Sequence, residues 1–295
     1  MVSRAAGMTP AVEDTALRNL TSARLGWAPV VLGIAATSLG PGARAQTLPV
    51  VQANREIGVG FSALYRDYRE SFPAGTPGRD REGGWTPGVA AGASWMGDAG
   101  GLRNLYGSIR VTYNAGNQNY RGSLFGSDTA LEFRSGLANT TVTAQLGKGF
   151  LVSPRLLITP AATFGYQLWN RDLGPGQTED YRTFMAGAAV RADYQAARRL
   201  VLRGQLGLAE TVDPRITFRY QHSYGTALAA RPVYQAGAGL DYALTARFHL
   251  SADAQVSRYG YGRSRNLATL EKGLIFEPAS TTTDSQLQLG LAYAF

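Results

Sequence analysis

Residues 286–295, QLQLGLAYAF, decide the fold of this chain. Large apolar side chains occupy every second position of the stretch: Leu287, Leu289, Leu291, Tyr293 and Phe295. The residues between them are glutamine, glycine and alanine. A strict period of two places these two sets on opposite faces of a β-strand, so the stretch predicts a strand with one apolar face and one polar or small face.

Nine earlier segments repeat the alternation, with different regularity, and no sustained helical period follows residue 45. We expect strands at 57–66, 89–96, 105–114, 138–146, 156–169, 184–194, 200–209, 234–242 and 249–257. With the terminal stretch they make ten strands. Eight or twelve strands are the alternatives, because the fourth and fifth long connections have room for a hairpin.

The connections between these segments alternate in length. Short links lie at 97–103, 147–155, 195–199 and 245–247, and longer links lie at 71–84, 117–128, 174–180, 211–231 and 262–283. Short turns on one rim and long loops on the other are typical of transmembrane barrels, whose strands of about 9 to 11 residues cross the bilayer at a tilt. Aromatic residues near strand ends, such as Trp95 and Trp169, suit the lipid headgroup zone. The sequence therefore predicts an all-β protein, a transmembrane antiparallel up-and-down β-barrel of about ten strands.

Composition narrows the function classes. The 295 residues include 36 glycines and 15 tyrosines but no cysteine, which excludes disulfides, cysteine metal sites and thiol nucleophiles. A mean hydropathy of −0.15 excludes a polytopic helical membrane protein. The formal charge of +8 comes from scattered arginines rather than from a basic cluster, so no nucleic-acid partner is expected.

The first 45 residues have the pattern of an export signal. Arg4, Arg18 and Arg24 precede an apolar run at 25–39, and a small-residue site, Ala-Arg-Ala, ends at Ala45. A basic region, a short apolar region and an A-x-A site together predict a cleaved secretory signal peptide. The expected organisation is a signal peptide at 1–45, a short periplasmic segment at 46–54 and the barrel at 55–295.

Over residues 57–295 the chain resembles bacterial outer-membrane β-barrel proteins of the small, porin-like class. The most specific element is the terminal alternation, and in that class such an end is read by the barrel-assembly machinery. The resemblance implies that the assembly signal here consists of Leu289, Leu291, Tyr293 and Phe295. It also implies assembly from the periplasm into a Gram-negative outer membrane, among its lipid and lipopolysaccharide. It implies no substrate.

If the apolar face contacts lipid, the other face lines the lumen. The polar lumen residues are then Arg66, Arg110, Arg191, Asp193, Arg203, Asp241, His249 and Asp253. Such a set can form a selectivity ring or a gated path for a small polar solute. It can equally form a static plug of ion pairs, because narrow barrels are usually filled by side chains. We expect a porin-like or structural surface barrel that passes or binds small polar solutes.

An outer-membrane hydrolase, either a protease or a lipid-modifying enzyme, is the alternative function. His222 lies in the fourth long loop, downstream of Glu210 and Asp213, and Asp172, Glu179 and Asp180 border the third. A histidine oriented by a carboxylate can activate water or a serine. Ten strands and five outer loops also resemble the omptin proteases, whose site pairs carboxylates with an Asp–His couple at the mouth. This chain departs from that pattern, with no paired aspartates near the first loops and no Asp-x-His, so we expect no catalytic site.

No metal or cofactor is expected either. His249 is the one histidine that the alternation assigns to the lumen, and in the sequence it is too isolated to indicate a set of ligands.

The last long loop offers a possible binding surface. Arg258, Arg263 and Arg265, interleaved with Tyr259 and Tyr261, can stack on sugars or pair with lipopolysaccharide phosphates, or form an ordinary charged rim.

Overall fold

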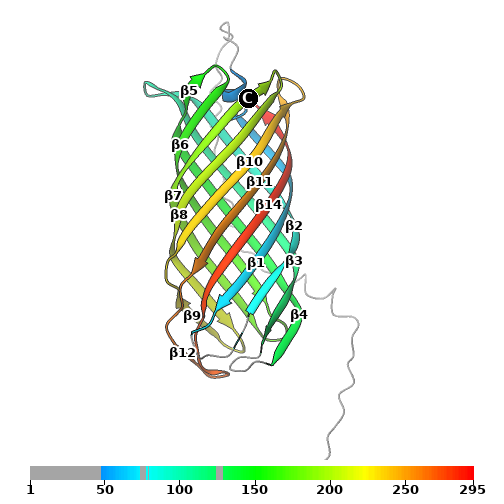
Figure 1. Cartoon of the computed structure of the whole chain (residues 1–295), viewed down its shortest axis with the longest axis vertical. Coiled ribbons are helices and arrows are strands. Elements are labelled where there is room, and N and C mark those ends of the chain that lie inside the picture. The colour runs from blue at the N-terminus through cyan, green and yellow to red at the C-terminus, as the bar shows by residue number, and fades with distance from the viewer. Residues whose placement is uncertain (1–47, 74–77, 79, 124–128) are drawn as a thin grey trace, which may run out of the picture. The chain divides into compact units, whose positions relative to one another are not determined.

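The computed structural model describes residues 48–73, 78, 80–123 and 129–295, and the expected signal peptide lies outside them. The described residues form a closed antiparallel barrel of ten strands (Figure 1). Consecutive wall strands pair with one another, and the last strand pairs with the first. No described helix has the length and apolar character that a membrane crossing needs.

The wall strands are β1 (Glu56–Ser71), β2 (Asp80–Ala99), β3 (Leu102–Ser123), β4 (Ala130–Lys148), β6 (Leu156–Asp172), β7 (Thr178–Ala197), β8 (Leu200–Arg219), β10 (Pro232–Ala243), β11 (Phe248–Tyr261) and β14 (Ala279–Ala294). Four short strands lie at the rims: β5 (Phe150–Ser153), β9 (Ser223–Ala227), β12 (Leu267–Thr269) and β13 (Gly273–Ile275). One helical turn, α1 (Pro49–Gln52), precedes the wall.

The predicted alternation is confirmed, and it covers the outside of the barrel with apolar side chains. Val59, Phe61, Leu206 and Leu289 are each exposed by 65–79%. The residues between them face inward and are small or polar. Such a belt suits lipid, and closure of the ladder leaves no unpaired strand edge in the hydrocarbon.

The wall strands are longer than expected. They run from 12 to 22 residues rather than 9 to 11, and the segments 80–84 and 117–123 are strand rather than loop. Asp80 pairs with Gly122 at the end of this extension. Side chains such as Glu82 and Gln118 are buried there, so the ladder persists beyond the apolar belt. The sequence expectation was wrong because Gly83-Gly84 interrupts the pattern of large side chains.

Neither of the alternative wall strand numbers, eight or twelve, is found in the described residues. The fourth long connection does contain a hairpin, β8 with β9, and the fifth contains β12 with β13, but these extend or cover the rim rather than add to the wall. A bulge at Asp213, whose φ is +44°, changes the parity of β8. Beyond it Ile216 and Phe218 turn inward and are buried.

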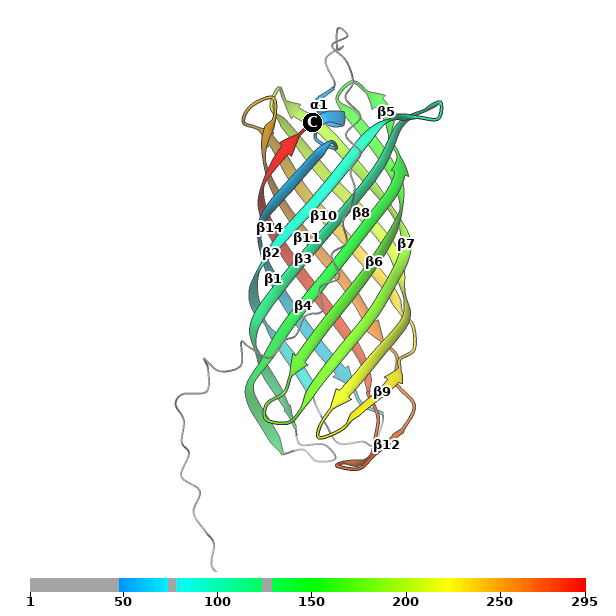
Figure 2. The ribbon, with the colours of Figure 1, turned by 180° about the vertical axis from the view of Figure 1, so that it is seen from behind.

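The core of this protein is the lumen, and it is filled at both ends. At the end that holds the C-terminus, α1 lies in the mouth of the barrel (Figure 2). In outer-membrane barrels this is the periplasmic end. Val50, Val51 and Ala53 pack there against four wall residues: Met96, Tyr106, Leu157 and Val201. A second cluster of buried side chains, which we call the aromatic cluster, fills the opposite, outer end. It consists of Tyr68, Trp169, Tyr181, Phe218, Tyr259 and Tyr261 with the aliphatic residues Leu137, Ile216, Leu228, Val233 and Ile275.

Candidate functional site

The structure places the eight predicted lumen residues on the inner side of the wall. Five of them are buried: Arg66, Arg191, Asp193, Asp241 and His249. Four line a central cavity: Arg110, Arg203 and Asp253, together with the buried Arg191. Along the barrel axis they fall into three groups: a hydrogen-bonded network at the periplasmic end, the residues of the central cavity, and Arg66 with its partners nearer the outer end.

The periplasmic network ties α1 to the wall. Arg191 donates three hydrogen bonds of 3.0–3.2 Å to Asp193 and one of 2.9 Å to the Tyr106 hydroxyl. The Asn54 side-chain amide donates to Asp193 at 3.2 Å, and Arg203 donates to the Ala53 carbonyl at 3.0 Å. Polar groups thus hold the short helical segment in place around its apolar contacts. We call α1 and residues 53–54 the periplasmic plug.

The central cavity lies beyond this plug. It has a volume of about 160 Å³, and a second cavity of about 70 Å³ adjoins it toward the outer end. Arg110 and Arg203 approach Asp253 at 3.6 Å each, too far for strong hydrogen bonds. Arg110 also donates to Gln288 at 3.0 Å, and 39% of its side chain is exposed. Arg203 is also bound to Asp193, at 3.3 Å, whereas the only carboxylate that pairs with Arg110 among the described residues is Asp253, at 3.6 Å. Arg110 therefore makes this cavity polar and open to an anionic group.

Arg66 forms a strut across the lumen. It donates two hydrogen bonds to Asp284, at 2.8 and 2.7 Å, in a bidentate arrangement. Its Nη2 also donates to Tyr259 and Asn139, and its guanidinium lies 4.5 Å from the centre of the Trp169 ring. These partners come from four different strands, so the strut joins opposite sides of the wall.

A second buried arginine organises the outer end. Arg171 is 1% exposed and donates to carboxylates on three other strands at 2.6–3.2 Å: Glu70, Asp80, Glu82 and Glu179. Its guanidinium also lies 4.9 Å from the centre of the Tyr68 ring. Four carboxylates around one guanidinium require dense pairing, and all five side chains are exposed by 10% or less. We call Arg171, its carboxylates and the aromatic cluster the outer plug.

Glu277, in the connection from β13 to β14, closes the outer plug from above. It is 3% exposed and accepts hydrogen bonds from Tyr181 at 2.6 Å and Tyr68 at 3.0 Å. Burial, reinforced by the nearby Glu179 carboxylate, raises the pKa of Glu277 to about 8. Its carboxyl group is therefore mainly protonated at neutral pH. The connection from β13 to β14 can thus bind to the outer plug without adding a further negative charge to it.

Sequence reasoning missed the outer plug. Asp80 and Glu82 form a pair of inward carboxylates at the first loop, where the sequence pattern predicted only loop and no paired aspartates. Arg171 was not among the candidate residues. The available signal was the two-residue step from Trp169 to Arg171 at the end of β6, which continues the inward face of that strand.

His222 has a carboxylate partner other than those expected. Its Nδ1 lies 2.7 Å from Oε1 of Glu271, which belongs to the last long loop, rather than beside Glu210 or Asp213. The Tyr224 hydroxyl donates to the other oxygen of Glu271 at 2.8 Å. Desolvation raises the pKa of the Glu271 carboxyl group, but the hydrogen bonds from His222 and Tyr224 outweigh it and lower this pKa to about 2. The pair is exposed at the outer rim, with 58% of the His222 side chain in solvent.

Two expectations about aromatic residues are wrong. Tyr259 and Tyr261 do not belong to a surface loop; they lie in β11, face the lumen and are 4% and 1% exposed. Only the arginines of that set are left for an outer surface, and Arg263 stacks on Phe276 at 4.0 Å. Trp169, expected near the lipid headgroups with other strand-end aromatics, is 1% exposed inside the outer plug. The longer strands explain both errors, because these residues lie above the apolar belt.

The expectation that His249 is isolated is also wrong. Its Nδ1 lies 2.8 Å from Asp241 Oδ1, and Glu56 approaches from the neighbouring side of the lumen. The sequence separates these residues, and only the closure of the barrel brings β1 near the turn between β10 and β11.

The similarity of this chain to known proteins lies in its structure. No protein-family profile matches the sequence, and no curated protein matches it. The outer-membrane protease OmpT from Escherichia coli matches with a TM-score of 0.59 and 10% identity, over 82% of this chain and 97% of that chain. Neisserial surface protein A gives 0.34 and 11% over 81% and 97%, and a major outer-membrane protein from Thermus thermophilus gives 0.36 and 14% over 80% and 99%.

At such identities the likeness to OmpT concerns the fold alone. The apolar belt adds independent physical evidence, because exposed side chains such as Phe61 and Leu289 suit lipid and would be costly in water. The closed wall, its apolar belt and the fold that it shares with OmpT together show that this chain is an outer-membrane β-barrel protein.

Proposed function

We propose that this protein is a closed-lumen barrel that binds a small polar, anionic solute in its central cavity. The observation that carries the proposal is the position of Arg110 at the cavity, where 39% of its side chain is exposed and its carboxylate partner, Asp253, lies 3.6 Å away. Arg203, which is paired with Asp193 at 3.3 Å, adds a second positive charge beside it. An anion bound there gains charge-assisted hydrogen bonds in surroundings of low dielectric. The plugs at the two ends argue against a permanently open pore.

Conductance tests the closed state. The protein, purified from outer membranes in detergent and inserted into a planar bilayer, should give no steady open-channel steps. Folding is checked first by its different migration on a gel before and after boiling. Steady, discrete steps from the folded protein would contradict the closed lumen and favour a porin instead.

Ligand stabilisation tests the binding site. A solute that binds only the folded state raises stability by RT ln(1 + [L]/Kd). Inorganic sulfate is the probe, with sodium chloride of equal ionic strength as reference. Sulfate should raise the unfolding temperature of the wild-type protein but not that of Arg110→Gln. Arg121→Gln is the matched control, because this arginine lies on the same strand but is 73% exposed. Equal stabilisation of all three proteins would disprove anion binding at the cavity.

A hydrolase at the outer rim is the second candidate, and the His222–Glu271 pair at 2.7 Å is the observation that favours it. OmpT, which shares the fold, is a protease by name. The hydrogen-bond partner of His222 is Glu271 rather than the neighbouring Ser223, and Asp80 and Glu82 are both bound to Arg171. Any hydrolysis of peptide or phospholipid by the purified barrel should fall at least tenfold in His222→Ala. An unchanged rate removes this pair from consideration.

A further inference from the structure

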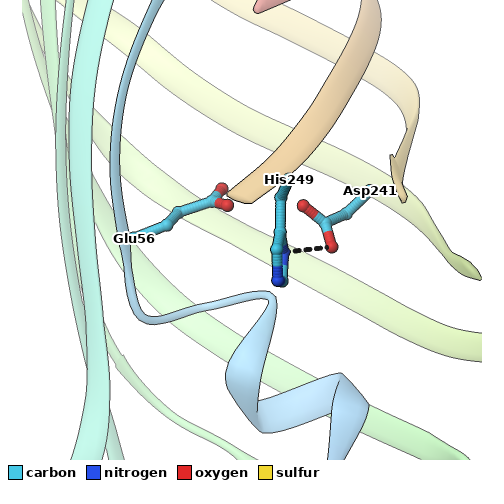
Figure 3. A group of neighbouring side chains, drawn as sticks. All are labelled: Glu56, Asp241 and His249. Carbon is cyan, nitrogen blue, oxygen red and sulfur yellow. Dashed lines mark hydrogen bonds and ion pairs between the residues drawn. The ribbon is translucent and has the colours of Figure 1, made fainter. Parts of the chain in front are cut away.

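Three side chains converge at the periplasmic end of the lumen, beside the plug (Figure 3). Glu56 is the first residue of β1, Asp241 lies near the end of β10, and His249 lies near the start of β11. Figure 3 shows the two carboxylates on either side of the imidazole, with α1 below. One ligand atom from each residue lies within 4.8 Å of the other two.

Two oxygen atoms of this group are unusual in being buried and unpaired. Oε2 of Glu56 and Oδ2 of Asp241 have no hydrogen-bond partner among the described residues. Asp241 is only 2% exposed. Burying a carboxylate oxygen without a partner is costly, so a native structure normally supplies a proton, a water or a cation at such a place.

The nearby hydrogen bonds do not satisfy these atoms. His249 is bonded to the other oxygen of Asp241, at 2.8 Å, and Arg203 approaches only the other oxygen of Glu56, at 3.9 Å. The arginine also interacts with Asp193 and Asp253. The unpaired oxygens therefore remain available to a ligand that the three side chains share.

We propose that Glu56, Asp241 and His249 bind one divalent transition-metal ion of the zinc class. Two carboxylates and one imidazole are ligand types that such ions accept, and their combined charge of −2 with neutral histidine matches a divalent cation. Metal–ligand bonds of about 2.0–2.2 Å place neighbouring ligand atoms about 3.0–3.5 Å apart. His249 and Asp241 are already 2.8 Å apart, and a ligand atom of Glu56 lies within 4.8 Å of both, so Glu56 would have to move inward to bind the same ion.

The cavity leaves space for a further ligand of the ion. Glu56 lines the central cavity, which gives room for a water as the fourth ligand. The ion also has a structural consequence. Glu56 follows the periplasmic plug by two residues, so the metal fixes the end of that plug to the turn between β10 and β11.

Zinc binding tests the site directly. The full chain, without a polyhistidine tag and stripped with a chelator, is titrated with Zn²⁺ in detergent against a chromophoric chelator. We expect one ion per chain, and an affinity that falls about tenfold or more in His249→Ala and in Glu56→Gln. Gel migration before and after boiling shows that each variant is folded, and Glu56→Gln serves where His249→Ala fails to fold.

The other histidine provides the matched control. His222 also pairs with a carboxylate, at 2.7 Å, but the described residues place no second carboxylate within reach of it. His222→Ala should therefore bind Zn²⁺ as the wild type does, and Co²⁺ should give its ligand-field absorption in both proteins but not in His249→Ala. Absence of binding to the wild type, loss in His222→Ala or retention in His249→Ala would each overturn the site.

Amide exchange tests the link to the plug. The amides of Ala53, Asn54 and Arg55 donate to carbonyls of the helical turn at 2.9–3.1 Å. Zn²⁺ should slow their exchange in the wild type and leave it unchanged in Glu56→Gln. Zinc binding without slower exchange would disprove the role of the metal in fixing the plug.

Discussion

Arg171 is the side chain on which the outer plug depends most. It is surrounded by four buried carboxylates and is 1% exposed, so its removal leaves those charges unpaired. Breaking a buried ion pair by removing one partner typically costs about 3–5 kcal/mol. We expect Arg171→Met to lower the free energy of unfolding by about this amount, measured by urea unfolding with tryptophan fluorescence, to which Trp169 in the same plug contributes.

The control for this substitution is an arginine of the same type in solvent. Arg215 pairs with Asp213 at 3.0 Å, but 64% and 55% of the two side chains are exposed. Exposed pairs contribute about 0–1 kcal/mol. Arg215→Met should therefore change the unfolding free energy little. Similar losses in both variants would show that burial of the Arg171 network has no special weight.

Glu277 gives stability a dependence on pH. Its pKa is raised from an ordinary value of 4.5 to about 8, mainly by burial, so the folded protein holds an extra proton between these values. A state that binds more protons loses stability as pH rises. The contribution is complete below about pH 4.5 and is lost as pH rises through about 8. The urea midpoint of the wild type should fall over this window, and the decline should be smaller in Glu277→Gln. Identical slopes would contradict the assignment.

At the scale of elements, the seam between β1 and β14 closes the barrel. Gly60 and Gly290 face each other across it, and a Cβ added to Gly60 would lie 2.7 Å from the Cα of Gly290 and closer still to the Leu289 carbonyl. Only glycine permits this approach of the two backbones. Overpacking of this kind costs about 1–3 kcal/mol.

We expect Gly60→Val to reduce both the unfolding free energy and the fraction of protein that shows heat-modifiable migration. Gly204→Val is the control, since an added Cβ there meets no atom within 4 Å. If the two valine variants fold equally well, the tight contact at the seam is not what limits closure.

The strands of the wall were predictable because lipid imposes a strict alternation on them. Leu287, Leu289 and Leu291 indicate β14 without any knowledge of its neighbours. The upper parts of the strands carry no such signal. There the outside faces water, so both faces of a segment such as 80–84 are polar or glycine, and local pattern cannot distinguish strand from loop.

The candidate sites depended on closure and were harder to predict. Alternation assigned Arg191 and Asp241 to the lumen, but it could not identify their partners. Asp80 meets Arg171 across 91 positions of sequence, and Glu56 reaches His249 only because the last strands return beside the first. Glu277 lies in a loop, where the sequence has no alternation to indicate which side chains point into the barrel.

At the scale of the whole molecule, the topology fixes which loops face outward. Both the periplasmic plug and the C-terminus lie at one end, and the long connections lie at the other (Figures 1 and 2). A short epitope inserted between Gly174 and Gly176, in the connection from β6 to β7, should bind antibody on intact cells. The same epitope inserted between Gly100 and Gly101, in a turn at the opposite end, should bind only after permeabilisation. The reverse pattern would invert the orientation.

The length of the wall has a consequence for what the cell presents to its surroundings. A strand of 22 residues, such as β3, is about 70 Å long at about 3.3 Å per residue, and at a tilt of about 40° it rises about 55 Å. The apolar band of such barrels is only about 25 Å tall. About half of the length of this longest strand therefore lies outside the apolar band. The wall where it is tallest holds the adjoining outer loops away from the lipid surface, where objects too large to approach the membrane itself can touch them.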